Sequence, residues 1–203
     1  MDKIKLAVIF YSSYGTNYQL AKWAQEGAEA VGADVRLLKV LELIPEEVIN
    51  TNPGMKGCVE MTKDVPIATS SDLEWADAYI FSTGTKFGNV SSQMKNFLDM
   101  QGGLWAEGKL SNKAVSAMSS AQNPHGGQES TIKALYGTMM HWGAIIVAPG
   151  YTDQSLFKAG GNPYGTSVSV GPNGEMIEDV EDAVKHQAKR TVEVASWIKK
   201  GQE

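Results

Sequence analysis

Residues 5–17 read KLAVIFYSSYGTN, and this stretch decides the fold. Its first part, residues 5–11, is apolar on both alternating sets of positions, which is typical of a strand buried on both faces of a parallel sheet. Residues 12–15 interrupt the apolar run. Beyond them, small and apolar side chains recur at the three-and-four spacing of a helix with one buried stripe, namely Leu20, Ala24, Gly27, Ala28 and Val31. A strand followed directly by such a helix predicts an α/β fold.

The same alternation continues along the rest of the chain. Further strands are predicted at residues 35–40, 78–83, 114–118 and 144–147, and further helices at residues 91–100, 130–140 and 180–200. This order predicts one α/β domain over residues 1–203, with a five-stranded parallel sheet and helices on both faces. The intervening residues 45–66 and 150–174 hold most of the prolines, and we expect them to be surface loops.

The composition argues against several functional classes. The 18 basic and 23 acidic residues leave a formal charge of -5, which disfavours binding to nucleic acid through a basic surface. No apolar run approaches the roughly 18 residues of a membrane span, and no signal-peptide cleavage region follows the first apolar run, so we expect a cytoplasmic protein without membrane insertion. The single cysteine, Cys58, excludes an internal disulfide, a cysteine-ligated iron–sulfur cluster and a multi-thiolate zinc site within one chain. We predict no metal site.

The loop after the first strand has the residue types of an anion site. In doubly wound sheets, ligands bind beyond the carboxyl ends of the strands, so the loops at residues 12–16, 84–90 and 119–128 are the candidate positions. The first loop opens a helix and offers hydroxyl and backbone N–H donors without an acidic side chain, from Ser12, Ser13, Tyr14, Gly15, Thr16 and Asn17. An ordinary helix cap and turn would use the same residues. A nucleoside triphosphate site would need a lysine and magnesium ligands, which this loop lacks.

The other two loops suit a flat ligand. In the loop after the third strand, glycines allow close approach, Phe87 offers an aromatic face and Lys86 a cation; the residues concerned are Thr85, Lys86, Phe87, Gly88 and Asn89. The loop after the fourth strand supplies amide and backbone donors from Ser119, Ser120, Ala121, Gln122, Asn123, Pro124, His125 and Gly126. Mobile surface turns are the alternative for both. Residues 103–109 have phosphate-loop spacing, but they lack the following Ser or Thr and a preceding strand.

Five segments in order carry a family resemblance. They are SSYGTN (12–17), TKFGN (85–89), GGLWA (102–106), SSAQNPHGGQE (119–129) and His141, and NPYG (162–165) follows them. Together they resemble the WrbA family of flavodoxin-like, FMN-dependent NAD(P)H:quinone oxidoreductases, over nearly the whole chain. The sequence departs from the family pattern at Thr16 and Asn17, at Gly84, and at residues 123–125, where the family is richer in glycine.

The resemblance implies an FMN site and an assembly. It places the FMN phosphate on residues 12–17, the isoalloxazine ring on residues 85–89, and the ring edge and ribityl chain on residues 119–126. It also places His141 beside the flavin, as the candidate catalytic proton donor or charge partner. Tyr14, Phe87 and Trp105 would form the substrate pocket, with Trp105 supplied by a neighbouring subunit of a homotetramer built from dimers.

The implied activity is a two-step reduction of quinones. NADH or NADPH would deliver a hydride to FMN and leave, and a quinone would then take two electrons on the same face, which is a ping-pong cycle. A flavodoxin-type one-electron carrier is one alternative, although such carriers tend to be shorter and more acidic. An accessory protein of a transcription repressor is the other, suggested only by the historical name of the family.

Overall fold

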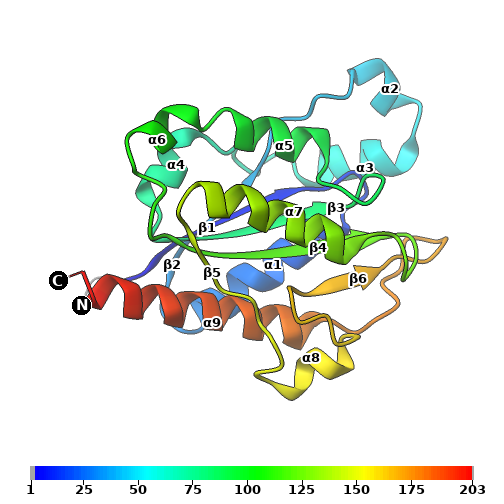
Figure 1. Cartoon of the computed structure of the whole chain (residues 1–203). Helices are drawn as coiled ribbons and strands as arrows, with labels where there is room; N and C mark the ends of the chain where they lie inside the picture. The colour runs from blue at the N-terminus through cyan, green and yellow to red at the C-terminus, as the bar shows by residue number, and fades with distance from the viewer. Residues whose placement is uncertain (1–2, 203) are drawn as a thin grey trace.

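A parallel β-sheet runs through the middle of the molecule in the computed structural model, which describes residues 3–202 (Figure 1). The strands lie in the order β2-β1-β3-β4-β5, and the short β6 also pairs with β4. Every pairing is parallel. The bounds are β1 (Lys5–Tyr11), β2 (Asp34–Lys39), β3 (Ala78–Gly84), β4 (Ala114–Ala121), β5 (Ile145–Ile146) and β6 (Ser167–Ser169). The predicted fold class, an α/β parallel sheet, is confirmed.

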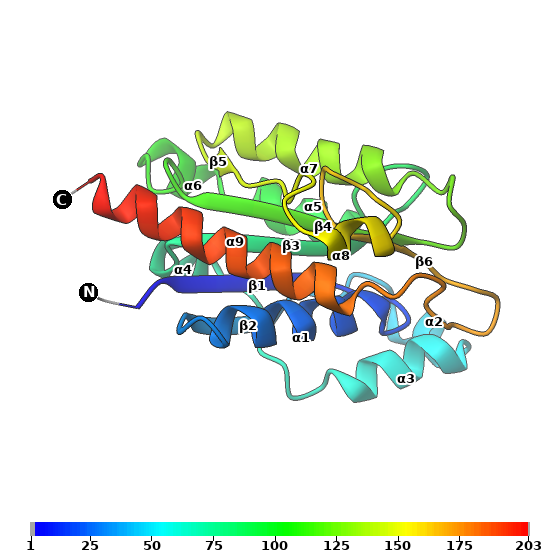
Figure 2. The same ribbon diagram turned by 90° about the horizontal axis from the view of Figure 1, so that it is seen from below.

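Helices cover both faces of this sheet (Figures 1 and 2). One face carries α1 (Thr16–Glu29) and α9 (Glu181–Lys200), and the other carries α4 (Ser70–Trp75), α5 (Ser92–Asp99), α6 (Gly102–Ala106) and α7 (Gln128–His141). Strand β1 feeds both layers, because Leu6 and Val8 pack toward α1 and α9 whereas Ala7 and Ile9 pack toward the opposite helices. The apolar pattern of residues 5–11 therefore reflects burial on both faces, as predicted.

Two segments expected to be irregular contain short elements. Residues 45–66 hold α2 (Glu46–Asn50) and α3 (Pro53–Met61), and residues 150–174 hold α8 (Gln154–Lys158) and β6. Side-chain caps, and not an apolar stripe, mark the starts of α3 and α8. The Asn52 side chain accepts hydrogen bonds from the first N–H groups of α3, and the Asp153 side chain does the same for α8. The expected loop around Trp105 is likewise the short helix α6.

The fifth strand position is divided between two segments. Strand β5 pairs with the amino end of β4, and β6 pairs with its carboxyl end along the same edge. A buried side chain on α9 holds the intervening chain in place: Gln187 Nε2 donates to Ser116 Oγ (2.6 Å) and to the Ala117 carbonyl (2.9 Å), and Gln187 Oε1 accepts from the N–H and hydroxyl of Thr166 (2.7 Å each). The segment packs so closely that a Cβ on Gly165 would lie 2.0 Å from the Ala117 oxygen.

The strand order places the switch point between β1 and β3. The chain leaves β1 toward one edge of the sheet and leaves β3 toward the other, so the loops that follow these strands diverge and leave a crevice at the carboxyl edge. The loop after β4 lies beside the loop after β3. Among the described helices, none is long and apolar enough to cross a membrane.

Candidate functional site

The loop between β1 and α1 ends in an uncapped helix terminus. Gly15 adopts a left-handed conformation (φ 96°) at the N-cap position, no side chain caps α1, and its first turn holds no acidic residue. The Gly15 N–H donates to Ser12 Oγ at 2.9 Å, which closes the loop. The N–H groups of the first turn of a helix lack intrahelical acceptors and carry partial positive charge. This neutral, donor-rich loop fits a phosphate group.

Asn17 and Ser120, two residues of the predicted ligand loops, have side chains that form buried hydrogen bonds. Asn17 is 3% exposed; its Nδ2 donates to Ser120 Oγ at 2.8 Å, and its Oδ1 accepts from Ser82 Oγ at 3.1 Å. These bonds join the first turn of α1 to β3 and β4. Any contact of Asn17 or Ser120 with a ligand would therefore come from the backbone, because buried polar groups keep the partners that satisfy them. The backbone N–H of Asn17 is still part of the helix end.

Ser13 is drawn away from the loop in a similar way. Its hydroxyl donates to the Tyr11 hydroxyl (3.3 Å), which in turn donates to the Glu42 carboxylate (3.2 Å). An ionised carboxylate only accepts, so it fixes the direction of this chain of donors. Burial raises the pKa of the Tyr11 phenol, and the Glu42 charge raises it further, so Tyr11 keeps its proton. The Ser13 side chain thus connects the loop to Tyr11 and Glu42.

Tyr14 and Cys58 connect the loop to α3. Tyr14 stands exposed at the rim, and its hydroxyl accepts from Asn52 Nδ2 at 3.2 Å. Cys58, which lies on α3 and not in an irregular loop, donates its thiol hydrogen to the Ser12 carbonyl at 3.2 Å. Burial raises the pKa of this thiol, so it stays protonated. Helix α3 therefore braces the loop from outside.

The loop after β3 holds an aromatic ring in the solvent. Lys86 and Asn89 exchange two backbone hydrogen bonds, and the two residues between them have positive φ, 53° at Phe87 and 76° at Gly88. This is the pattern of a type I′ turn, in which a bulky first residue is strained. Phe87 is nevertheless fully exposed and gains no packing within the chain. Strain of this kind concentrates at functional sites.

The loop after β4 closes on itself and touches the Phe87 turn. The Asn123 carbonyl accepts from the Gly126 N–H (3.0 Å) and from Gln128 Nε2 (2.9 Å), which leaves residues 122–125 exposed. Gly127 has a φ of 95°, and a Cβ there would lie 2.5 Å from the Gly88 Cα. On the inner side, the Thr85 N–H donates to the Ser120 carbonyl at 2.9 Å. The structure thus brings all three predicted loops together at one edge of the sheet.

His141 and Trp105 lie at the opposite edge. Helix α7 returns from the carboxyl edge and ends at His141, whose carbonyl accepts a 2.9 Å hydrogen bond from Trp105 Nε1 (Figure 1). The eight residues of β4 separate them from the loops by about 23 Å. Within one chain, neither residue reaches a ligand beside Phe87. A slot that includes Phe87, Trp105 and His141 would therefore need residues from more than one chain.

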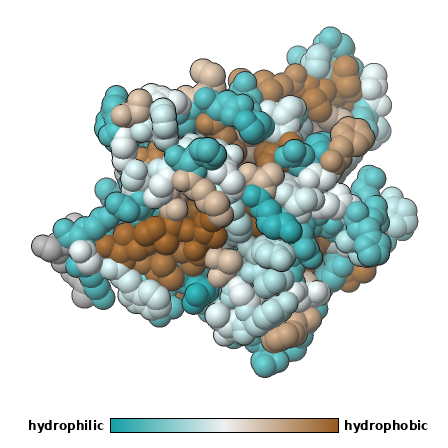
Figure 3. Space-filling view, in the orientation of Figure 1, coloured by the Kyte–Doolittle hydropathy of each residue, from teal (hydrophilic) through white to brown (hydrophobic). Residues whose placement is uncertain are grey.

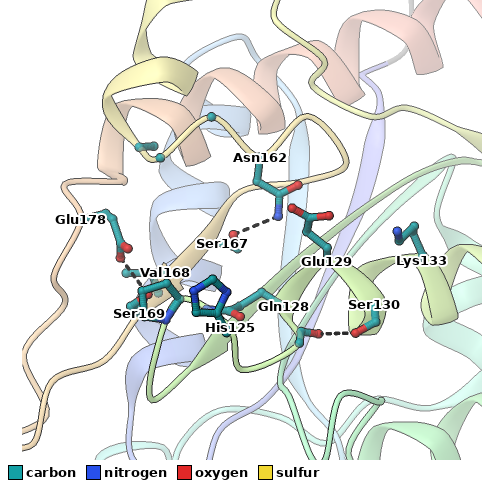
Figure 4. Close-up of a pocket in the computed structure, with 15 residues that line it drawn as sticks. His125, Gln128, Glu129, Ser130, Lys133, Asn162, Ser167, Val168, Ser169 and Glu178 are labelled. Atoms are coloured by element: carbon teal, nitrogen blue, oxygen red, sulfur yellow. Dashed lines mark hydrogen bonds between the residues drawn. The ribbon is translucent and has the colours of Figure 1, made fainter.

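A pocket of about 460 Å³ lies on the outer side of the loop after β4 (Figure 4). Its walls come from residues 124–133, from residues 159–162, from β6 and from Glu178. This pocket was not predicted from the sequence, because about half of its wall belongs to residues 150–174, which were expected to be an irregular surface loop. Recognising the cap residue Asp153 would have indicated structure there, although no local pattern predicts which helix this segment faces.

Replacing Phe87 with Asn should raise the free energy of unfolding of the ligand-free protein by about 1 kcal/mol. Asn-Gly is the pair that a type I′ turn prefers, and the exposed ring leaves no packing to lose. Equilibrium urea denaturation measures the change. The control, Phe87→Leu, keeps a bulky residue at positive φ and should leave stability unchanged. A less stable Asn variant would show that the turn is not strained.

Comparisons with known proteins agree with this geometry. A family model described as NADPH-dependent FMN reductase matches residues 4–153. An NAD(P)H dehydrogenase (quinone) of Deinococcus radiodurans is 53% identical over 196 residues, which are 96% of this chain and 97% of the relative. One of Aromatoleum aromaticum is 40% identical over 206 residues, covering 98% and 99%.

Solved structures agree on the fold. The crystal structure of a flavodoxin, WrbA-like protein from Agrobacterium tumefaciens superposes with a TM-score of 0.65 at 20% identity, covering 98% of this chain and 99% of that one. A flavodoxin of Megasphaera elsdenii superposes with a TM-score of 0.55 at 13% identity, covering 93% and 98%. The fold is therefore flavodoxin-like, and the predicted resemblance is confirmed. The chain belongs to the NADPH-dependent FMN reductase family, among the WrbA-like NAD(P)H dehydrogenases (quinone).

Proposed function

We propose that this chain catalyses the two-electron reduction of quinones by NADH or NADPH, with FMN held in the crevice at the carboxyl edge. One observation carries the proposal: the uncapped, uncharged end of α1 opens into the same crevice as the outward-held ring of Phe87. The first feature suits a phosphate, and the second suits a flat ring stacked in the open. The curated relatives share the name NAD(P)H dehydrogenase (quinone), which supports the activity.

Each of the three loops would hold a different part of the cofactor. The hydroxyls of Ser12 and Thr16 and the N–H groups of residues 14–17 would bind the phosphate. Residues 85–89 would hold the ring, and residues 119–126 would border the ring edge and the ribityl chain. The bound FMN supplies the redox chemistry, taking a hydride from the coenzyme and passing two electrons to the quinone.

The chain itself would orient the substrates and stabilise charge. Phe87 would hold a flat substrate parallel to the ring, at the near-attack distance of roughly 3 to 3.5 Å that hydride transfer needs. Within residues 3–202, the N–H groups of Phe87 and Gly88 donate to no backbone acceptor, so both are free to face negative charge on a reduced ring. The exposed ammonium group of Lys86 adds a cation to the same turn.

Thr16→Glu tests the phosphate position. The new carboxylate should weaken FMN binding at least about tenfold, through repulsion and the loss of a hydrogen bond to a charged group. Riboflavin, which lacks the phosphate, should bind as it does to the unchanged protein. Titration of flavin fluorescence measures both affinities, and Thr16→Gln controls for side-chain length. An equal loss for both flavins would place the phosphate elsewhere.

Steady-state kinetics test the activity itself. Because coenzyme and quinone would occupy the same face of the ring in turn, double-reciprocal plots at several fixed quinone concentrations should give parallel lines. Intersecting lines would refute the shared position. If neither NADH nor NADPH bleaches the flavin absorbance of FMN-saturated protein, the chain is an electron carrier and not this enzyme.

We further propose that a second copy of the chain completes the crevice, in a homotetramer built from dimers. Phe87 lacks a cover within one chain, while Trp105 (56% exposed) and His141 are presented at the far edge. Figure 3 shows a hydrophobic area between α9 and β5 near that edge. Ile145 of β5 and Trp197 of α9 are both exposed. Trp105 and His141 of one copy would then approach the flavin of another. We also propose a cytoplasmic location, since a chain with a single cysteine needs no internal disulfide and hence no oxidising compartment.

Trp105→Ala tests this assembly. The unchanged protein should sediment as a tetramer, and the variant should show a KM for quinone raised about tenfold, because a buried aromatic contact to the substrate is lost. Phe157→Ala, which removes an equally exposed ring from α8, should change neither property. A stable monomer with full quinone reductase activity would contradict the shared site.

A further inference from the structure

The pocket beside the loop after β4 lies next to the Phe87 turn. Gly127 lines the pocket, and its backbone is packed against Gly88 in the Phe87 turn. The first two turns of α7 form one wall, and β6 with residues 159–162 forms the other (Figure 4). A long ligand stacked on Phe87 can therefore extend past Gly127 into this pocket.

The lining of the pocket is polar. It offers hydroxyl groups from Ser130, Ser167 and Ser169, an amide from Asn162, and carboxylates from Glu129 and Glu178. Quinones have few groups that such a surface could bind, whereas a nucleoside presents vicinal hydroxyls and hydrogen-bonding base edges. The volume, about 460 Å³, lies in the usual range for small-ligand sites.

Glu129 and Lys133, two charged residues that line this pocket, do not pair with each other. Glu129 and Lys133 stand four residues apart on α7, a spacing that commonly forms an ion pair. Lys133 Nζ instead lies over the ring of Tyr164, 4.8 Å from its centroid, and Glu129 forms no ion pair within residues 3–202. Figure 4 shows Glu129 pointing across the pocket toward Asn162.

Asn162 and Glu178 complete the arrangement around Glu129. Asn162 Nδ2 donates to Ser167 Oγ at 2.9 Å, which fixes the amide at the pocket wall. Glu178 Oε2 accepts from the Ser169 N–H at 2.6 Å, so it holds β6 while adding a second negative charge. One ammonium group, that of Lys133, faces these two carboxylates. The site therefore accepts hydrogen bonds from hydroxyl groups. It repels a phosphate group, which carries about two negative charges.

We propose that this pocket binds the adenosine half of the coenzyme, and that Glu129 accepts the hydroxyl groups of its ribose. A carboxylate in this role is a general means of selecting NADH, whose ribose carries a free 2′-hydroxyl, over NADPH, whose ribose carries a phosphate there. The proposal rests on the proposed function, in which a nicotinamide coenzyme stacks on the flavin beside Phe87. It adds a second binding subsite and a coenzyme preference.

Binding of 5′-AMP and 2′,5′-ADP, the adenosine halves of NADH and NADPH, tests the pocket without catalytic turnover. Calorimetric titration of the FMN-loaded protein should give a dissociation constant for 5′-AMP about tenfold lower than for 2′,5′-ADP, since the latter places its phosphate against Glu129. Glu129→Lys should reverse that order, and Glu129→Gln should abolish it. Glu47→Lys makes the same charge change on α2, far from the pocket, and should leave the order intact.

The outcomes separate the two proposals. Tighter binding of 2′,5′-ADP to the unchanged protein, removed by Lys133→Ala, would overturn the assignment of Glu129 as the selecting group. Equal rates of flavin reduction by NADH and NADPH, in both the unchanged protein and Glu129→Lys, would overturn the pocket as the adenosine subsite. Flavin that neither coenzyme reduces, in protein that still binds 5′-AMP in the expected order, would overturn the proposed function and leave the nucleoside pocket supported.

Discussion

The buried amide of Asn17 is the constraint on which the crevice depends. It bonds to Ser82 on β3 and to Ser120 on β4, so the first turn of α1 is fixed against the two strands whose loops form the other walls. A buried amide that loses its partners costs about 1 to 3 kcal/mol. The three loops therefore hold one relative position before any ligand arrives, and this preorganisation lowers the entropic cost of binding.

The parts of the fold predicted from sequence are those with strong periodicity. Residues 5–11 and 78–83 are apolar on both faces because helices cover both sides of the sheet. Helices α2, α3 and α8 were missed because they are short and expose most of their residues. The side-chain caps Asn52 and Asp153 mark the starts of α3 and α8. Strand β6 has three residues, and only its pairing with β4 makes it a strand.

For the site, position in the chain was predictable and side-chain direction was not. The loops had to meet at the carboxyl edge of a parallel sheet, and they do. Whether the Ser13 side chain points toward a ligand or toward Tyr11 depends on Glu42, a residue 29 positions away that no local pattern connects to it. The same limit applies to His141: the antiparallel return of α7 puts it at the far edge, which becomes evident only when the helix direction is followed.

The Phe87 turn and the neighbouring pocket differ in the ligand groups that they suit. Phe87 presents an exposed aromatic ring, and the pocket is lined by polar groups. An exposed ring at positive φ is unfavourable in an isolated chain, so its position is explained by contact with a flat ligand or with another copy of the chain. The pocket beyond Gly127 offers carboxylates and hydroxyls, for which a quinone has few hydrogen-bonding groups. A coenzyme has both a flat ring and a hydroxyl-rich half, so it can engage the whole surface, whereas a quinone engages only the ring. Binding energy from contacts outside the shared face would thus favour the coenzyme over the quinone.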